Sequence, residues 1–202
     1  MNLYKNDLPS DVVFDGSVAI DTETMGLVTK RDRLCLVQMC SKDGEVHMVQ
    51  IEKGQQHKAV NLKKMLEDPK ILKIFHFARF DIEILNYTFG IRVKNIYCTK
   101  IASKLVRTYT DRHGLKNLVR EILGVEISKQ EQSSDWGREK LSDEQVKYAA
   151  GDVLYLHDLK KKLDYMLERE NRAELAKNCF DTLQLISDLD LLGISPEELF
   201  VH

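Results

Sequence analysis

The chain has 202 residues, of which 43% are hydrophobic, and it carries a formal net charge of −2 with a sequence pI near 6.3. This length favours one domain, and the composition allows a substantial core and excludes a disordered chain. The near-neutral charge excludes strong, sequence-independent adhesion to long nucleic acid, so a protein of this kind that acts on phosphates must attract them locally.

The sequence contains no evident leader or membrane span. Residues 1–15 lack a charged start followed by an apolar stretch, and no apolar run approaches the length needed to cross a membrane. The four cysteines form no CxxC pair and lie in or beside apolar runs: Cys35, Cys40, Cys98 and Cys179. We therefore expect a soluble, cytoplasmic protein with buried thiols rather than disulfides or zinc ligands.

Three strand-like runs come first, separated by glycine and charged residues, at 18–21, 34–40 and 46–51. A helical pattern at 59–66 ends at Asp68-Pro69, and a buried strand is predicted at 71–75. These runs predict an antiparallel meander that continues into a helix and a further strand.

The second half begins with a predicted helix at 81–89 and a short strand at 96–98, and further helices are expected after Thr99. The alternation of helices and strands predicts an α/β domain with a mixed sheet. From Ser142 onward the chain reads as almost wholly helical. A charged helical stretch is predicted at 143–169, and an amphipathic one follows through Leu175, Cys179, Leu183, Ile186 and Leu189.

Acidic residues in three segments indicate a metal site. Asp21 and Glu23 lie at i and i+2 at the end of an apolar run, so in a strand both carboxylates leave the same face. Tyr148 and Asp152 lie at i and i+4, which places a phenol and a carboxylate one helical turn apart. Asp81 follows another apolar run. Each feature alone is weak, but together and in this order they predict a metal-dependent exonuclease site.

The same residues carry a family resemblance. The strings DTE (21–23), HFARFD (76–81) and YAAGD (148–152) resemble the three exonuclease motifs of the DEDD superfamily, and the tyrosine four residues before the last aspartate resembles its DEDDy branch. The strings HGLKNL (113–118) and SSDW (133–136) resemble ribonuclease D. Nearly the whole chain is similar to the nanoRNase C family of short ribonuclease D relatives.

The resemblance implies a ribonuclease H-like (DnaQ-like) exonuclease fold, with a mixed five-stranded sheet flanked by helices and a helical C-terminus. It implies a single 3′-5′ exonuclease domain over residues 1–202, with a C-terminal helical extension from about 171 to 202. The residues after YAAGD are too few for the C-terminal domains of ribonuclease D, so we expect a bare catalytic module.

The resemblance also implies two divalent cations, Mg²⁺ or Mn²⁺, and release of nucleoside 5′-monophosphates from the 3′ end of RNA. Asp21 would bridge both ions, and Glu23 and Asp152 would complete the site of the attacking water. Asp81 would support the ion beside the leaving 3′ oxygen, largely through water, and Tyr148 would orient and help deprotonate the attacking water. An unperturbed tyrosine is a poor base at neutral pH, so the cations must do most of the activation.

The resemblance implies further substrate contacts from Thr22, Gly26, Leu27, His76, Arg107, Arg112 and His113. Several of them have a second interpretation. Leu27 is either a wedge between the last two bases or a core residue, and His76 contacts either the terminal nucleotide or the core. The basic stripe of Lys100, Lys104 and Arg107, which continues to Arg112, His113 and Lys116, is either a phosphate-binding surface or a solvated face. Trp136 either stacks on a base or packs against the catalytic helix.

Substrate and assembly remain open from the sequence. Very short RNAs, dinucleotides above all, are the expected substrates, and a general ribonuclease D-type exonuclease acting on longer RNA or on DNA is the alternative. A non-catalytic RNA-binding module is disfavoured because every carboxylate of the motifs and Tyr148 are present. The resemblance and the apolar C-terminal segment imply a homo-oligomer, plausibly an octamer, with a dimer as the alternative.

Overall fold

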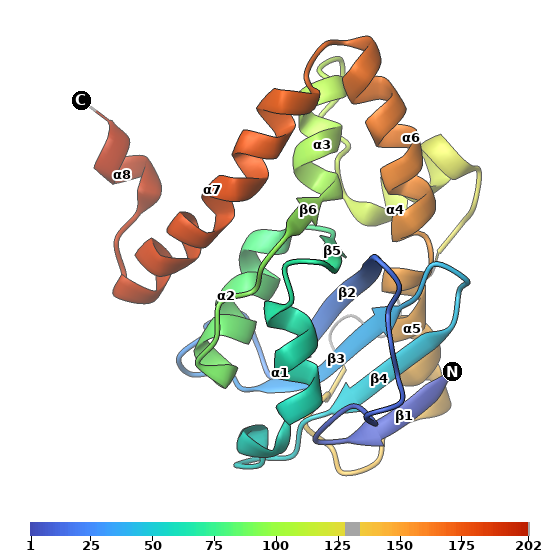
Figure 1. Cartoon of the computed structure of the whole chain (residues 1–202), viewed down its shortest axis with the longest axis vertical. Helices are drawn as coiled ribbons and strands as arrows, with labels where there is room; N and C mark the ends of the chain where they lie inside the picture. Colours follow the sequence, from blue (N-terminus) through green and yellow to red (C-terminus); the bar gives the residue numbers. More distant parts are fainter. Residues whose placement is uncertain (128–133, 202) are drawn as a thin grey trace.

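The computed structural model describes residues 1–127 and 134–201. In this part of the chain a mixed six-stranded sheet lies between layers of helices (Figure 1). The strands are β1 (Asn2–Lys5), β2 (Ser17–Thr24), β3 (Leu34–Cys40), β4 (Val46–Gln50), β5 (Leu72–Phe75) and β6 (Ile96–Cys98). Their order in the sheet is β1-β4-β3-β2-β5-β6.

The predicted meander is confirmed. Strands β2, β3 and β4 pair antiparallel, whereas β5 pairs parallel to β2 and β6 pairs parallel to β5. All seven side chains of β3 are buried, as expected for a central strand covered on both faces. The α/β fold class is therefore confirmed, with a sixth strand that the sequence did not predict. This strand, β1, pairs parallel to β4 at the sheet edge and alternates between half-buried and exposed residues.

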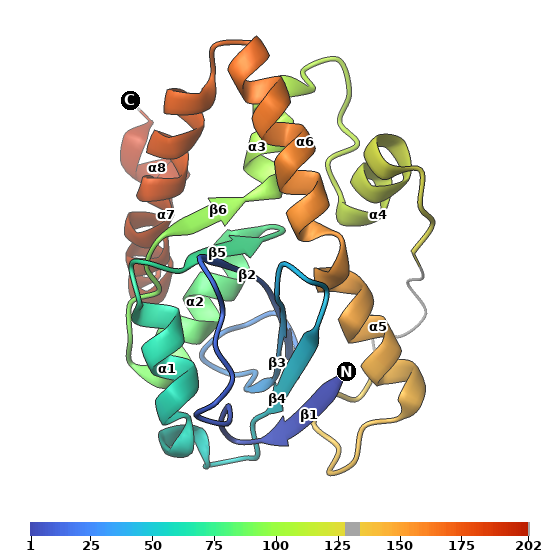
Figure 2. The same ribbon diagram turned by 45° about the vertical axis from the view of Figure 1, so that its right-hand side comes forward.

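Helices cover both faces of the sheet (Figure 2). One face carries α1 (Val60–Glu67) and α2 (Ala78–Phe89), and α5 (Asp143–Leu154) packs on β2 and β3 from the other. The remaining helices are α3 (Thr99–Val106), α4 (Leu115–Leu118), α6 (Leu156–Arg169), α7 (Ala173–Leu192) and α8 (Pro196–Phe200), with a π-helical turn at Val119–Leu123 and a 3₁₀ turn at Gln56–Lys58.

The predicted helix at 143–169 is two helices. The break lies at Tyr155, whose φ of −100° and ψ of −1° interrupt the hydrogen-bond pattern between α5 and α6. The apolar side of α5 packs against the sheet, and the apolar side of α6 packs against α3. A single straight helix could not bury its apolar residues against both of these surfaces.

The prediction of which residues of the C-terminal helix are buried is also partly wrong. On α7 the buried residues are Ala176, Phe180, Leu183, Ser187 and Leu189, whereas Leu175 is half exposed. Phe180, which was not among the predicted residues, packs its ring against Tyr97 of β6, with the centroids 4.7 Å apart.

Three of the cysteines, Cys35, Cys40 and Cys98, are buried, and Cys179 is half-buried on α7. Among the described residues, no helix is long and apolar enough to cross a membrane.

Candidate active site

Strand β2 carries the first acidic pair to an open edge of the sheet. Asp21 and Glu23 alternate with Thr22, so they leave the face on which α5 packs. The parallel partner β5 pairs with β2 only as far as Ala19. Beyond Ala19 the edge of β2 on that side is therefore free to be approached by side chains of the helices.

Helix α5 brings the second acidic segment to the same place. The helix begins with a capping box, in which the Ser142 hydroxyl accepts the backbone N–H of Gln145 and the Gln145 side chain accepts that of Ser142. This fixes the start of the helix, and Asp152 then projects toward β2. One carboxylate oxygen from each of Asp21, Glu23 and Asp152 lies within 4.8 Å of the other two.

Asp81 reaches the site from the first turn of α2. It is 3% exposed, and one of its oxygens accepts the Thr22 hydroxyl at 2.7 Å. Thr22 was predicted as a substrate contact, and the structure shows that its hydroxyl is donated to Asp81. Asp81 lies outside the group of three close oxygens.

Gln38 is a neighbour of the site that sequence reasoning missed. It lies opposite Asp21 in β3, is fully buried, and donates from Nε2 to an Asp21 oxygen at 2.8 Å. A polar side chain in the strand LCLVQMC, where the other residues are apolar, was the available signal.

The carboxylates raise one another's pKa values. Burial, followed by Asp81 and Asp152, holds the pKa of Asp21 well above its usual range. Burial and Asp152 raise the pKa of Glu23 to about 9, and burial raises the pKa of Asp81 to about 7. The repulsion between the carboxylates of such a cluster is relieved either by protonation or by a bound cation. Because all the donors are carboxylate oxygens, the set fits a hard divalent cation such as Mg²⁺ or Mn²⁺.

Tyr148 lies one turn before Asp152, as predicted. Burial, followed by the charges of Asp152, Glu23 and Asp21, raises the pKa of its phenol, which therefore stays protonated at neutral pH. Its ring lies against that of Trp136, with the centroids 6.1 Å apart. Trp136 is 2% exposed, so the predicted packing against the catalytic helix is confirmed. Ser133 of the same motif lies outside the described residues.

Asp21, Glu23 and Asp152 line a cleft of about 680 Å³. Met25, Gly26 and Leu27 form one wall, and the 83% exposure of Leu27 rules out the interpretation as a core residue. His76 also lines the cleft, and its Nδ1 lies 2.9 Å from the Thr99 hydroxyl.

Phe77 and Phe80 also line the cleft although they were not predicted as substrate contacts, and Lys100 and Lys116 reach it from the basic stripe. The ammonium of Lys100 lies 4.0 Å from the centre of the Phe77 ring. Phe77 has a left-handed backbone (φ 68°) just before α2, a conformation that is uncommon for a bulky residue and often found at functional sites.

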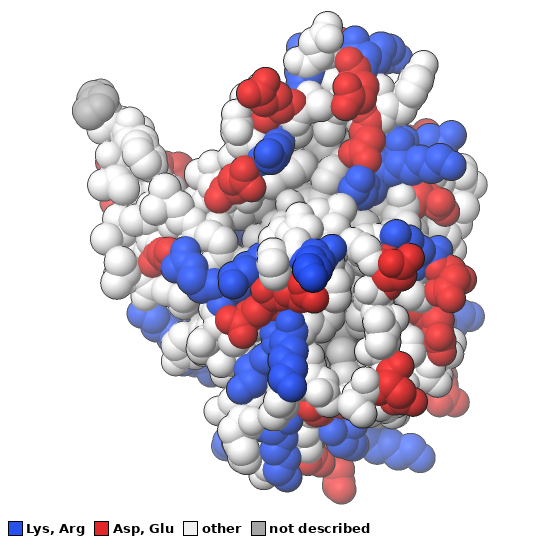
Figure 3. Space-filling model, in the orientation of Figure 1, with Lys and Arg blue, Asp and Glu red and all other residues white. Residues whose placement is uncertain are grey.

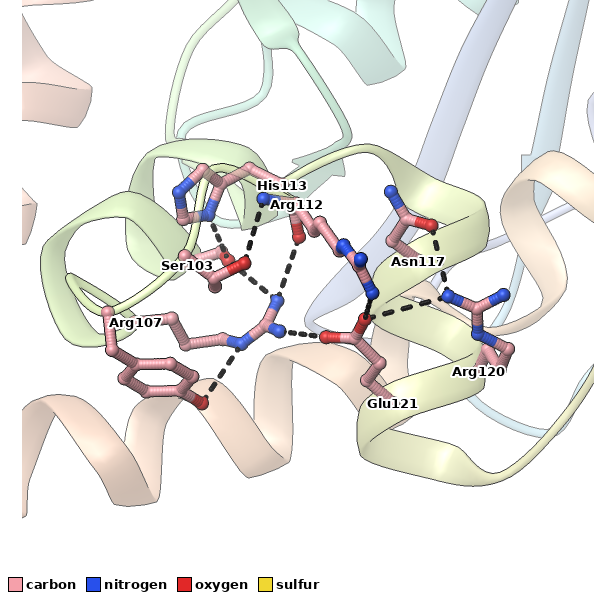
Figure 4. A network of polar contacts seen from close by, with 9 residues as sticks. Ser103, Arg107, Arg112, His113, Asn117, Arg120 and Glu121 are labelled. Atoms are coloured by element: carbon pink, nitrogen blue, oxygen red, sulfur yellow. Dashed lines mark hydrogen bonds and ion pairs between the residues drawn. The ribbon is translucent and has the colours of Figure 1, made fainter.

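The predicted contacts Arg107, Arg112 and His113 do not line this cleft. They belong to the polar network of Figure 4, in which the buried guanidinium of Arg107 binds Glu121 and donates to the Arg112 carbonyl at 3.1 Å. His113 Nδ1 lies 2.9 Å from the Ser103 hydroxyl. These interactions occupy the polar groups of Arg107, so the basic stripe reaches the cleft at Lys100 and Lys116 instead.

Comparison with known proteins identifies the family. The family model described as 3′-5′ exonuclease matches residues 5–168. Ribonuclease D of Gluconacetobacter diazotrophicus is 35% identical over 183 residues, which are 91% of this chain and 45% of that protein. The chain therefore spans less than half the length of this curated relative.

Two solved structures match over almost their full length. Brucella melitensis NrnC bound to pGG is 53% identical, with a TM-score of 0.94 and coverage of 100% of this chain and 98% of the other. Brucella melitensis NrnC with bound Mg²⁺ is 52% identical, with a TM-score of 0.93 and the same coverage.

Proposed function

This chain belongs to the 3′-5′ exonuclease family as an exoribonuclease of the ribonuclease D and NrnC type, and on that premise we propose that it hydrolyses short RNAs, dinucleotides above all, to nucleoside 5′-monophosphates. The observation that carries the proposal is the group of three carboxylates, with oxygens within 4.8 Å, in the cleft that Leu27 borders. The matched NrnC structures hold pGG and Mg²⁺, which supports a short phosphorylated RNA and a divalent cation here.

We assign the metal-ligand role to Asp21, Glu23 and Asp152, with Asp81 acting more remotely through its contact with Thr22. When bound, two divalent cations would supply charge stabilisation at the phosphate and acidify the attacking water. Gln38 holds Asp21 in place through its amide.

The remaining chemistry belongs to the side chains of the cleft. We assign Tyr148 the role of orienting the attacking water and helping to remove its proton. Burial and the charges of the neighbouring carboxylates raise the pKa of its phenol in the metal-free protein, and bound cations would offset those charges. Attack on the last phosphorus breaks its bond to the 3′ oxygen of the preceding nucleotide, so the released nucleotide keeps its phosphate at the 5′ position. Leu27 separates the last two bases and thereby fixes which phosphate reaches the carboxylates.

The size and charge of the molecule favour a short substrate. A cleft of about 680 Å³ is within the range of roughly 300–1,000 Å³ typical of sites for one small ligand. On the face shown in Figure 3, basic and acidic side chains are intermixed and form no continuous basic track for a long strand. Contacts within the cleft can supply affinity instead, and among the described residues Lys100 and Lys116 line the cleft as cations available to phosphates.

Rates on substrates of graded length test the proposal. We would measure kcat/KM with Mg²⁺ for 5′-phosphorylated RNAs of two, three, five and twenty nucleotides, with matched DNAs and with chelator. A sharp maximum at two nucleotides is expected. Values that stay flat or rise with length would identify a general exonuclease of the ribonuclease D type, which the match to ribonuclease D keeps as the alternative.

We also propose that the chain works as a homo-oligomer, plausibly an octamer. Large apolar side chains are exposed at the end of α7, on α8 and just after it: Leu192 (72%), Leu199 (51%), Phe200 (67%) and Val201 (73%). This helical arm projects from the body of the molecule (Figure 1), and apolar surface of this kind is normally covered by a partner. Light scattering at micromolar concentration is expected to show an assembly, and a fully active monomer would contradict it.

A further inference from the structure

The loop between β2 and β3 presents Leu27 to the cleft in an unusual way. The side chain is 83% exposed although it is apolar, and the loop that carries it contains no helix or strand. An exposed side chain that separates two bases is most effective when its backbone is already ordered, because ordering the loop on binding would cost free energy and weaken the affinity for substrate.

A single buried carboxylate organises this loop. Asp32 is 8% exposed, and its Oδ2 accepts the backbone N–H of Val28 at 3.0 Å. The Val28 carbonyl in turn accepts the backbone N–H groups of Arg31 at 2.9 Å and of Asp32 at 2.8 Å. The segment from Val28 to Asp32 is therefore a closed turn, held by the side chain of its last residue.

Asp32 also lies against the residue on the other side of Leu27. A Cβ atom on Gly26 would meet the Asp32 Oδ2 at 2.3 Å, which no real contact allows. Gly26 is thus required by the close approach of the carboxylate and not by a left-handed backbone. Its carbonyl accepts the Thr24 hydroxyl at 2.5 Å, which fixes the entry to the loop.

The carboxylate is held in its charged form. The Arg31 guanidinium donates to both of its oxygens at 2.8 Å and lowers the pKa of Asp32 to about 2. The base of the loop is fixed separately by Arg33, which donates to the carbonyls of Ile51 at 2.9 Å and Gly137 at 3.0 Å. The tip that carries Leu27 therefore depends on Asp32, whereas the base does not.

We propose that Asp32 is a positioning residue that holds Leu27 in the cleft and so sets the enzyme's affinity for substrates with two adjacent bases. Both neighbours of Leu27 touch the same carboxylate, Val28 through a hydrogen bond and Gly26 through close packing. Asp32 lines no part of the cleft itself, so it acts only through the loop. This inference rests on the proposed function, in which Leu27 separates the last two bases.

A double-mutant cycle on two substrates tests it. With a 5′-phosphorylated RNA dinucleotide, Asp32→Ala and Leu27→Ala should each lower kcat/KM about tenfold, mainly through KM, and the double variant should lose no more than either single one. The p-nitrophenyl ester of thymidine 5′-phosphate has one base only, so its turnover by Asp32→Ala should stay within about twofold of wild type.

The control is Asp43→Ala, which removes another turn-forming carboxylate, bonded to the Ser41 hydroxyl in the exposed turn between β3 and β4. It should leave both substrates unaffected. If Asp32→Ala fails to fold, Asp32→Asn replaces it in the cycle, because its side-chain oxygen can still accept from Val28 while the ion pair with Arg31 is lost; a smaller KM effect than that of Leu27→Ala is then expected.

Three results would overturn the inference: an unchanged dinucleotide KM in the Asp32 variant, equal losses on both substrates, or losses that add in the double variant. Failure of the proposed function is read from the wild type alone, since its kcat/KM would then stay flat or rise with RNA length, whatever the Asp32 variant does.

Discussion

Replacing Glu23 by glutamine should stabilise the metal-free protein at alkaline pH. Burial and the neighbouring carboxylates raise the pKa of Glu23 from 4.5 to about 9, so between these values the folded state binds a proton that the unfolded state has lost. The contribution of Glu23 to stability is therefore full below pH 4.5 and is lost as pH rises toward 9. Each pH unit costs about 1.4 kcal/mol per group, which gives about 4 kcal/mol between pH 5 and pH 8.

Glutamine cannot ionise and escapes this cost. We expect the free energy of unfolding of Glu23→Gln to exceed that of the wild type by about 2–4 kcal/mol at pH 8 and to equal it near pH 5. The smaller figure allows for the coupling of Glu23 to Asp81 and Asp152. For a protein of this size the difference corresponds to roughly 5–15 °C in Tm.

Thermal unfolding in EDTA at pH 5, 6.5 and 8 measures this effect, and Glu168→Gln, at an exposed position on α6, is the matched control. Adding Mg²⁺ at pH 8 should stabilise the wild type more than the variant, because the cation replaces the proton. A Glu23→Gln protein that is no more stable than wild type at pH 8 in EDTA would refute the electrostatic reasoning.

The remaining predictions concern activity and the network of Figure 4. Asp21→Asn and Asp152→Asn should each abolish measurable turnover while the fold survives, and the double variant should be no worse in single-turnover assays, because the ligands act as a unit; near-normal turnover in both would exclude the site. Tyr148→Phe should lower kcat by roughly 10²–10⁴ with little change in Mg²⁺ affinity, and unaltered turnover would reduce Tyr148 to a packing residue. Arg107→Leu should cost about 3 kcal/mol in urea unfolding, because it leaves Glu121 without its buried partner, and should leave the KM for a dinucleotide nearly unchanged; a selective rise in KM would restore Arg107 as a substrate contact.

The acidic site could be predicted because its geometry is local. Alternation along a strand places Asp21 and Glu23 on one face, and one helical turn joins Tyr148 to Asp152, whatever the rest of the fold does. The order of the motifs then supplied the family and its fold. Strand limits followed the apolar runs closely, as in β3 and β6.

Contacts between distant segments could not be predicted in this way. Thr22 bonds to Asp81, and Gln38 bonds to Asp21, only because the fold brings their elements side by side. The same is true of the burial of Arg107 against Glu121. The basic stripe illustrates the difficulty, because helical spacing shows which side chains share a face but not whether that face meets a cleft, solvent or another helix.

The most direct test of metal-dependent cleavage at this cluster is hydrolysis of a 5′-phosphorylated diguanylate by wild type and by Asp152→Asn, each with Mg²⁺ and with EDTA. Wild type with Mg²⁺ should convert the dinucleotide completely to guanosine 5′-monophosphate, and the other three reactions should yield none. Cleavage that persists in EDTA, or an Asp152→Asn variant as active as wild type, would contradict the assignment of the reaction to these carboxylates.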